Sequence, residues 1–415
     1  MPLQVSRYFD IHKLTFVLLC LAALLFPFSV AATNLLMALV IVLGIASGAF
    51  HAGVKLLRND AGPVALALVA YLGLLVVGLL WSADQSYGLE VVGHYWFWLA
   101  LPVILSVAEY PGQRKIFLTS LSVGLLLHLL LCVIQWFGLY HVNLAGSNAD
   151  DATGHIGHIG FGFIYGVWAA WLLDMGWQSR DRIRWIYWGC AIWSWVMIFV
   201  AQGRAGYIVA AILMIFVFFK RVKLTVRSTV AVTLFLALVS LITLSSETGR
   251  QRLDTSIMHI QGVFSGDVSA ADPRFSYWLI ALEAWKRSPV LGVGTGGFPE
   301  ASKDICEEHP ELKYSPEAQP PGNPHNTYLL SLSRWGPLGL ILVFGVIGGW
   351  LLQGRRQPSN GELNTGLLIQ LTGIAILIDA MFAPTFEQHF TGLFLVMLLG
   401  AGVVTRRDQH SQSDP

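Results

Sequence analysis

Two pieces of sequence decide how this chain is organised: DPRFSYWLIALEAWKRSPVLGVGTGGF at 272–298 and NPHNTYLLSLSRWG at 323–336. Both lie within residues 245–336, the one long polar segment in a chain otherwise built of apolar runs. Most of the candidate functional residues, arginines and a histidine, and the glycine turns beside them lie in this segment. We therefore expect the rest of the chain to hold it at a membrane surface.

The composition predicts an all-α polytopic membrane protein. Hydrophobic residues make up 55% of the 415 residues and charged residues only 12%, and the mean hydropathy is +0.61. Soluble domains carry roughly 25% charged residues, and a soluble core cannot bury this much apolar surface. The net charge of +1 comes without a basic patch, so nothing points to nucleic acid as a partner. The four cysteines show no spacing typical of a metal site.

Apolar runs of membrane-spanning length recur along the chain. Because a bilayer core needs about 20 apolar residues per helix, we predict transmembrane helices near 14–31, 33–50, 64–81, 90–107, 116–136, 157–176, 183–201, 205–219, 227–244, 325–352, 364–383 and 389–405, about twelve in all. The first run resembles a signal peptide, since Val30–Ala31–Ala32 looks like a cleavage site. Signal peptides have apolar cores of about 7–15 residues, and this longer run is interpreted as an uncleaved first span.

These spans divide the chain into three predicted parts. Residues 1–244 hold transmembrane helices one to nine, and 245–324 form one large loop that contains amphipathic helices. Residues 325–415 hold helices ten to twelve and a C-terminal tail. We find no internal repeat.

The distribution of Lys and Arg predicts the orientation in the membrane, because cytoplasmic connections are enriched in both residues. With the N-terminus inside, the inner segments hold 17 of the 26 basic residues, and the short outer connections hold only Arg204. We therefore expect both termini in the cytoplasm and the large loop in the periplasm. The inner basic residues are Arg7, Lys13, Lys55, Arg58, Arg114, Lys115, Arg180, Arg182, Arg184, Lys220, Arg221, Lys223, Arg227, Arg355, Arg356, Arg406 and Arg407.

An amphipathic helix is predicted within the loop. Asp272 is a good N-cap and Pro273 suits the first helical position. The apolar residues recur on one helix face, which we expect to lie on the membrane surface: Phe275, Trp278, Leu279, Leu282 and Trp285. Pro289 ends this helix, and residues 292–298 follow as a tight glycine loop. The acidic, proline-containing stretch 299–322 is interpreted as a lid or surface loop.

Two arginines lie at positions where a positive charge is disfavoured unless it is paired or binds a ligand. Arg204, in Gln202–Gly203–Arg204–Ala205–Gly206, lies between two spans on the outer side. Arg274 begins a helix, where the helix dipole disfavours a cation. A bound phosphate would account for Arg274, since helix N-termini and arginines both favour phosphate. The alternatives are a boundary arginine that reaches into the headgroups for Arg204, and a salt bridge to Asp272 or another loop acid for Arg274.

His325 is the candidate general base. It follows Asn323 and Pro324, so the pattern places it in the first turn of the tenth span, at the positive end of the helix dipole. That position favours the neutral imidazole, which is able to accept a proton. The alternative is a histidine that only makes hydrogen bonds at the membrane interface.

Other polar residues in the spans have simpler interpretations. His155 and His158 are two ligands at most, which does not make a metal site. Arg334 and Asp379 lie inside predicted spans and are expected to form a structural ion pair. The glycines between 154 and 166 are expected to allow close packing of helices.

Three motifs together resemble the O-antigen ligase and polymerase superfamily of bacterial inner-membrane glycosyltransferases. The first is Gln202–Gly203–Arg204–Ala205–Gly206. The second is Arg274–Phe275–x–x–Trp278, continued by the glycine loop, and the third is His325–Asn326–x–Tyr328–Leu329. The motifs cover about residues 200–345. The chain departs from the family pattern at Gly203, where members usually have serine, and at Arg334, where many have an acid.

The resemblance implies a function. The expected reaction is transfer of a polysaccharide from undecaprenyl pyrophosphate to a sugar hydroxyl of lipid A–core, with inversion and without a metal, nucleotide or other cofactor. This would complete lipopolysaccharide on the periplasmic face of the inner membrane. His325 would be the base, and Arg204 and Arg274 would hold the pyrophosphate, with Asn326, Tyr328 and Gly294 in support.

The same motifs leave alternatives open. An O-antigen polymerase often has two large polar loops on the outer side of the membrane. A protein O-oligosaccharyltransferase usually has an extra C-terminal region. This chain has one dominant loop and a short tail, which favours the ligase. A transporter or flippase is the least favoured alternative, because transporter sites lie near the bilayer midplane in repeated halves.

The predicted topology can be tested with reporter fusions. Fusions after Arg250 and within 299–322 should report the periplasm, and a fusion after Arg227 should report the cytoplasm. The physical reason is the retention of Lys and Arg on the cytoplasmic side. The reversed pattern would remove the basis for every site proposed on the outer face.

Overall fold

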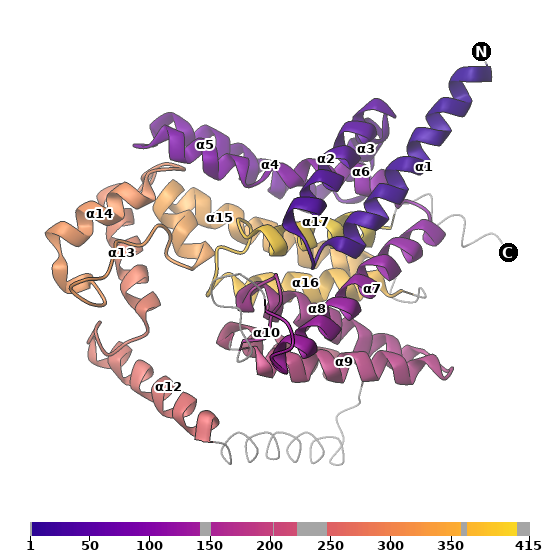
Figure 1. The fold of residues 1–415 in the computed structure, drawn as a ribbon. Coiled ribbons are helices and arrows are strands. Elements are labelled where there is room, and N and C mark those ends of the chain that lie inside the picture. The colour runs from indigo at the N-terminus through magenta and orange to yellow at the C-terminus, as the bar shows by residue number, and fades with distance from the viewer. Residues whose placement is uncertain (1, 142–150, 202, 222–246, 358–362, 405–415) are drawn as a thin grey trace. The chain divides into compact units, whose positions relative to one another are not determined.

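The computed structural model describes residues 2–141, 151–201, 203–221, 247–357 and 363–404 (Figure 1). All regular elements in these ranges are helices, which confirms the predicted all-α fold for the described part of the chain. They are α1 (Pro2–Leu25), α2 (Val30–Ala46), α3 (Ala49–Asp60), α4 (Gly62–Val77), η1 (Gly78–Trp81), α5 (Gln85–Gly93), η2 (Trp96–Leu99), α6 (Ala100–Val107), α7 (Pro111–Trp136), α8 (His158–Gln178), α9 (Ile183–Val200), α10 (Arg204–Arg221), α12 (Glu247–Ser265), α13 (Pro273–Arg287), α14 (Phe298–Glu308), η3 (Pro310–Leu312), α15 (Thr327–Arg356), α16 (Thr365–Asp379) and α17 (His389–Gly402).

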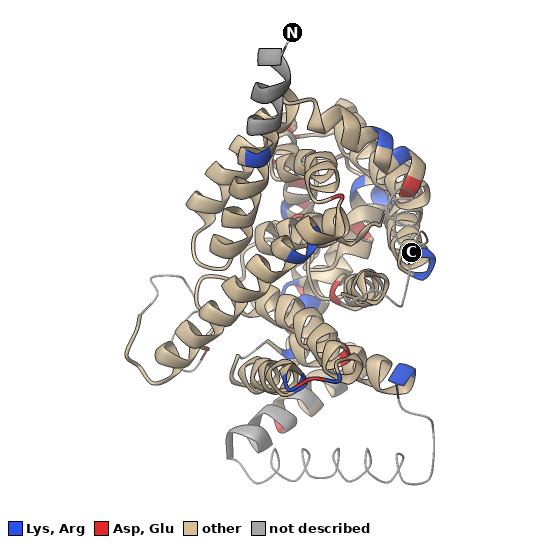
Figure 2. Cartoon of the chain, turned by 90° about the vertical axis from the view of Figure 1, so that its right-hand side faces the viewer, with Lys and Arg blue, Asp and Glu red and all other residues tan. Residues whose placement is uncertain are grey.

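The helices are those of a membrane protein. Five of the helices in the described ranges are long and apolar enough to cross a bilayer, and the count rises to seven if each of two bent helix pairs is one span. Three shorter apolar helices lie at Ile11–Leu25, Thr365–Asp379 and His389–Gly402. Figure 2 shows long stretches of helix without a charged residue. The ninth predicted span, 227–244, lies outside the described residues, and the count of twelve stays a prediction.

The predicted span at 33–50 is shorter than expected because the helix breaks. α2 ends at Ala46, and α3 leaves at an angle of 89°. Gly48 between them has a positive φ of 78°, a conformation that glycine adopts without steric cost. The sequence pattern did not reveal this break, because the apolar run continues through Ala49 and Phe50.

Close contacts divide the chain into two units. The first comprises residues 1–73, 90–214 and 342–415, and the second comprises 74–89 and 215–341. In the first unit α8 is buried along nearly its whole length and packs against α9, α16 and α17. The second unit contains α12, α13, α14 and the beginning of α15.

Small residues bring α8 and α10 into close contact in the first unit. A Cβ added at Gly162 would lie 2.3 Å from the Gly206 Cα, and one added at Gly166 would lie 3.5 Å from the Ala210 Cα. The two contacts advance together along both helices, so α8 and α10 run in the same direction. This confirms that these two glycines serve helix packing.

In the second unit the glycine loop pairs with a break in α15. Trp335 and Gly336 have non-helical dihedral angles, and Pro337 follows them. The Val293 N–H donates to the Ser333 carbonyl and the Gly294 N–H to the Arg334 carbonyl, both at 2.8 Å. The loop therefore supplies hydrogen bonds that the broken helix does not.

Thr295 extends this junction to the end of α4. The Trp335 Nε1–H donates to the Thr295 Oγ1 at 3.0 Å, and that hydroxyl donates to the Leu75 carbonyl at 2.7 Å. The Gly296 N–H donates to the Ser82 Oγ at 2.8 Å. The predicted tight loop is thus confirmed, and its role is to join α4, η1 and α15.

At Gly294 in the loop and Gly336 at the break of α15, both the positive φ and the lack of room for a Cβ require glycine. Gly294 has a φ of 85°, and a Cβ there would lie 2.5 Å from the Ser82 Cα. Gly336 has a φ of 63°, and a Cβ there would lie 2.1 Å from the Val290 carbonyl oxygen. Any other residue at either position would force the loop away from α15.

The interpretation of 299–322 as a loop is wrong for its first part. Residues 298–308 form α14, whose buried side chains are Phe298, Ser302, Ile305 and Cys306. Their spacing of four, three and one residues is that of one helix face. The flanking prolines and the acidic composition obscured this short amphipathic helix.

The predicted helix after Asp272 is confirmed, but a different face of it is buried. Asp272 Oδ1 accepts the Arg274 N–H at 3.0 Å, and α13 ends at Arg287. The buried residues of α13 are Ser276, Ile280, Ala281 and Ala284. The aromatic stripe is only half-buried, and its position on the membrane surface stays a prediction.

We predict that Gly294→Ala separates the glycine loop from α15 and destabilises the protein by about 1–3 kcal/mol, because the alanine must adopt a positive φ against the Ser82 backbone. The measurement is the denaturant midpoint of the detergent-solubilised protein. Gly322→Ala is the matched control, since a Cβ at Gly322 meets nothing within 4 Å. Equal midpoints for the two variants would contradict this account.

Candidate functional site

His325 does not lie in the first turn of a helix, as the sequence pattern predicted. α15 begins at Thr327, and its N-cap is Asn326, whose Oδ1 accepts the Leu329 N–H at 3.0 Å. The His325 N–H donates to the Asn323 Oδ1 at 2.9 Å, and His325 has a φ of 48°. Positive φ is uncommon for a residue with a side chain, and strained residues of this kind cluster at functional sites.

His325 is expected to be neutral, as predicted, but the physical cause is not the helix dipole. Burial lowers the pKa of His325, and the positive charge of Arg274 lowers it further. Both effects disfavour the imidazolium. The ring is therefore available to accept a proton at neutral pH.

Only one nitrogen of this imidazole is open to a ligand. Nδ1 is buried and has no hydrogen-bond partner among the described residues. His325 itself is half-buried, so Nε2 is the ring nitrogen that a substrate can reach. An unpartnered buried nitrogen is unusual and calls for an explanation by function.

One face of α13 completes the surroundings of His325. Arg274 supplies the nearby positive charge, and the Tyr277 ring lies with its centroid 6.0 Å from that of His325 at 31°. Arg274 and Tyr277 are three residues apart and so share a helix face. Tyr277 was not among the residues predicted for the site, although its spacing of three from Arg274 places both on one helix face.

Among the described residues, no ion pair of the predicted kind neutralises Arg274. Asp272 caps its backbone N–H, and the other carboxylate oxygen of Asp272 lies 3.7 Å from His259 Nδ1. Across the described ranges, no carboxylate comes within 4.0 Å of the Arg274 guanidinium. Arg274 is therefore a half-buried cation with charge to offer a ligand.

A small hydrophobic core fixes α13 against α15. It is formed by Ile280, Ala281, Ala284, Phe298, Ile305, Cys306 and Leu330, which are buried or nearly so. Burying one large apolar side chain of this kind stabilises a fold by about 1.5–3 kcal/mol. The core joins α13, α14 and the first turn of α15, and so holds the Arg274 face next to His325.

Arg204 lies in the first unit, as the exposed first residue of α10. Gly203 before it packs on the backbone of His158: a Cβ at Gly203 would lie 2.8 Å from the His158 carbonyl oxygen. This contact gives a physical reason for glycine where serine is usual. The expected joint action of Arg204 with Arg274 and His325 stays a prediction.

The remaining predicted residues lie in helix caps, in a helix turn or in buried positions. Asn326 caps α15, and Tyr328 lies half-buried in its first turn. Arg334 is fully buried at the break of α15. Asp379 ends α16 and accepts a hydrogen bond from the Thr385 hydroxyl at 2.7 Å. The predicted pairing of Arg334 with Asp379 stays a prediction.

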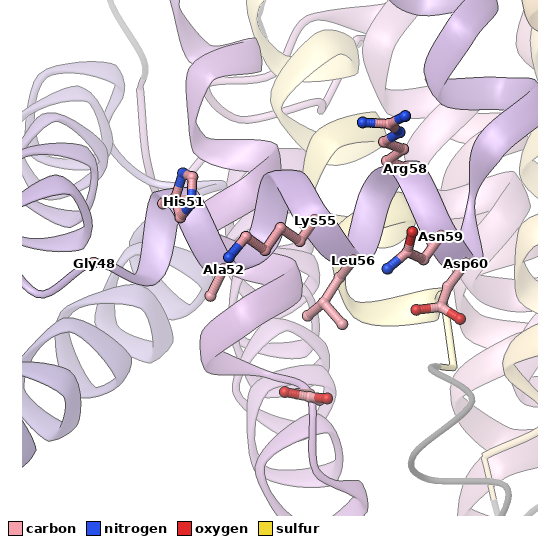
Figure 3. Close-up of a pocket in the computed structure, with 9 residues that line it drawn as sticks. Gly48, His51, Ala52, Lys55, Leu56, Arg58, Asn59 and Asp60 are labelled. Carbon is pink, nitrogen blue, oxygen red and sulfur yellow. The ribbon is translucent and has the colours of Figure 1, made fainter.

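Two cavities lie away from His325. One, of about 770 Å³, is lined by polar residues that include Asp84, Glu300 and Lys303. The other, of about 860 Å³, lies at α3 in the first unit (Figure 3). It is lined by Gly48, His51, Ala52, Lys55, Leu56, Arg58, Asn59, Asp60 and Glu109. The described residues contain no group of three side chains able to hold a metal ion.

The arrangement around His325 combines two chemical capacities. A neutral imidazole with an accessible nitrogen is able to take a proton from a hydroxyl. A neighbouring guanidinium is able to hold an anion through two parallel hydrogen bonds. Together they suit a reaction in which a hydroxyl attacks and an anion leaves.

The comparison with known families agrees with this chemistry. Residues 189–344 match a family model described as O-antigen ligase, and the matched range contains Arg204, Arg274 and His325. The resemblance predicted from the three motifs is therefore confirmed for residues 189–344. No curated protein matches the chain.

We predict that Arg274→Gln raises the pKa of His325, because it removes the charge that opposes protonation of the ring. The measurement is the rate at which diethyl pyrocarbonate modifies His325 as a function of pH, followed on its peptide by mass spectrometry, since only neutral imidazole reacts. Arg287→Gln is the control, because Arg287 pairs with Glu308 at 2.7 Å. An unchanged midpoint in Arg274→Gln would contradict the electrostatic coupling.

Proposed function

We propose, from the match of residues 189–344 to a family model described as O-antigen ligase, that this chain is an O-antigen ligase. It transfers polysaccharide from undecaprenyl pyrophosphate to a sugar hydroxyl of lipid A–core and so completes lipopolysaccharide. The observation that carries the proposal is His325: a half-buried imidazole with a lowered pKa, held beside an arginine inside the matched segment.

In this reaction His325 acts as the general base. Its Nε2 takes the proton of the acceptor hydroxyl while the hydroxyl oxygen forms a bond to the anomeric carbon of the donor. The bond from that carbon to the phosphate oxygen breaks, and its electron pair leaves on the pyrophosphate. Attack from the face opposite the leaving group inverts the configuration. The proton on His325 then passes to water.

Arg274 has two effects that support this assignment. Its charge stabilises the pyrophosphate as negative charge develops there, and a charge-assisted hydrogen bond of this kind is worth about 1.5–3 kcal/mol. The same charge lowers the pKa of His325 and so keeps the base neutral before the reaction. Arg204 is the proposed second ligand of the pyrophosphate.

The proposed location is the bacterial inner membrane, with both termini in the cytoplasm and the reaction on the periplasmic face. Both substrates are lipid-anchored and meet at this face. The support is the Lys and Arg distribution and the apolar helices.

A second candidate is the O-antigen polymerase, which the same family pattern admits. One large polar segment that leads directly to His325 favours the ligase over the polymerase. A protein O-oligosaccharyltransferase is the third possibility within the superfamily, with a protein as acceptor.

A deletion strain for this gene distinguishes the candidates. We expect polymerised glycan to accumulate on the undecaprenyl carrier and lipopolysaccharide to end at the core, because the transfer step is missing. Gel analysis of lipopolysaccharide and of carrier-linked glycan measures both. If core molecules instead carry single repeat units, the protein is the polymerase.

Variants returned to that strain test the residues. We expect His325→Ala to lower transfer at least about 100-fold, the typical contribution of a general base. Arg204→Lys and Arg274→Lys should also fail, because lysine does not reproduce the planar fork. His309→Ala is the control, since the His309 side chain is 43% exposed and pairs with Glu311. Near-normal turnover in His325→Ala would exclude it as the base.

A further inference from the structure

His158, a histidine other than the proposed base His325, is held in one orientation by the carboxylate of Asp151. The His158 Nδ1 lies 3.1 Å from the Asp151 Oδ2 and donates its proton to it. The Asp151 side chain is 10% exposed and that of His158 is 42% exposed. The carboxylate therefore fixes Nδ1, and the other ring nitrogen, Nε2, is left for a ligand.

The turn that carries Asp151 is itself fixed. Residues 151–154 are buried, and the Gly154 N–H donates to the Gln135 Oε1 of α7 at 2.9 Å. Gly154 has a positive φ of 58° and packs against the His128 ring. Asp151 thus has a position set by α7, and the orientation of His158 does not depend on a bound ligand.

His158 and Arg204 begin two helices that run side by side in the same direction. The close contacts of Gly162 with Gly206 align α8 with α10. At their first turns, Gly203 lies against the His158 backbone: its Cβ would be 2.8 Å from the carbonyl oxygen and 3.4 Å from the His158 Cβ. His158, which carries the oriented imidazole, and Arg204 therefore begin two helices whose first turns are in contact within the first unit.

These observations assign His158 a role in the proposed reaction. We infer that His158, oriented by Asp151, binds the donor pyrophosphate next to Arg204. Its imidazolium form donates from Nε2 to a phosphate oxygen and from Nδ1 to Asp151, so both ring protons are used. The inference rests on the proposed function for the identity of the anion. It assigns no proton transfer to His158.

A pair of amide variants separates the two ring nitrogens. In His158→Asn the amide reaches the position of Nδ1, so the bond to Asp151 is kept and the group at Nε2 is lost. In His158→Gln the amide reaches the position of Nε2, so a donor to the ligand is kept and the bond to Asp151 is lost. His155→Asn is the control, because His155 is a neighbouring imidazole on the same turn and lies 3.5 Å from the Tyr140 hydroxyl.

The measurement is binding of undecaprenyl pyrophosphate to purified full-length protein in nanodiscs, with undecaprenol as the uncharged probe. We expect His158→Asn to weaken binding of the pyrophosphate about tenfold, the loss of one charge-assisted hydrogen bond. His158→Gln should bind more tightly than His158→Asn, and His155→Asn should match the wild type. Binding of undecaprenol should be the same in all. A matching thermal midpoint confirms that each variant is folded.

Several results would overturn the inference. A purely structural role predicts the opposite order, with His158→Gln weaker than His158→Asn. Normal pyrophosphate binding with reduced turnover in His158→Asn would assign His158 to proton transfer instead. Unchanged binding in His158→Asn, with weakened binding in Arg204→Lys, would reject His158 while the proposed function stands. A wild type that does not prefer the pyrophosphate over undecaprenol would reject both.

Discussion

The pairing of the glycine loop with the break in α15 is the interaction on which the second unit depends. In a continuous helix the Ser333 carbonyl would accept the N–H of residue 337, but that residue is Pro337 and has none. A carbonyl left open in apolar surroundings costs several kcal/mol. Val293 and Gly294 supply the missing donors. The loop and the helix break are therefore one structural device, in which each satisfies backbone groups of the other.

This device sets where the chemistry lies. The glycine loop ends α13 and begins α14, and these two helices share a core with Leu330 in the first turn of α15. His325 stands just before that turn, in a left-handed conformation held by Asn323. Its strain is balanced by the packing around it, as is common where a side chain must point in a functional direction. Changes in the loop would therefore move His325 without touching it.

The electrostatics of the site also follow from packing. Arg274 and His325 are far apart in sequence, yet the shared core of α13 and α15 makes them neighbours. One cation then both favours the neutral base and offers charge to a leaving anion. In the first unit small residues in α8 and α10 bring the starts of these two helices together, with His158 and Asp151 at one and Arg204 at the other. Side-chain packing thus positions the charged residues in the second unit, and close helix contacts through glycine position them in the first.

The amino-acid sequence by itself determined the helical membrane architecture, the start of α13 at Asp272–Pro273, the tight glycine loop and the family resemblance of residues 189–344. Each of these follows from local composition, caps or motif spacing. The sequence did not place His325, because Asn323 and Asn326 are both able to cap a helix and only packing selects Asn326. It also missed α14, whose prolines and acids hide a buried face, and the contacts of Tyr277 and Asp151 with their histidines. These features depend on residues distant in sequence, and local periodicity carries no information about which distant residues meet. Tertiary structure alone decided them.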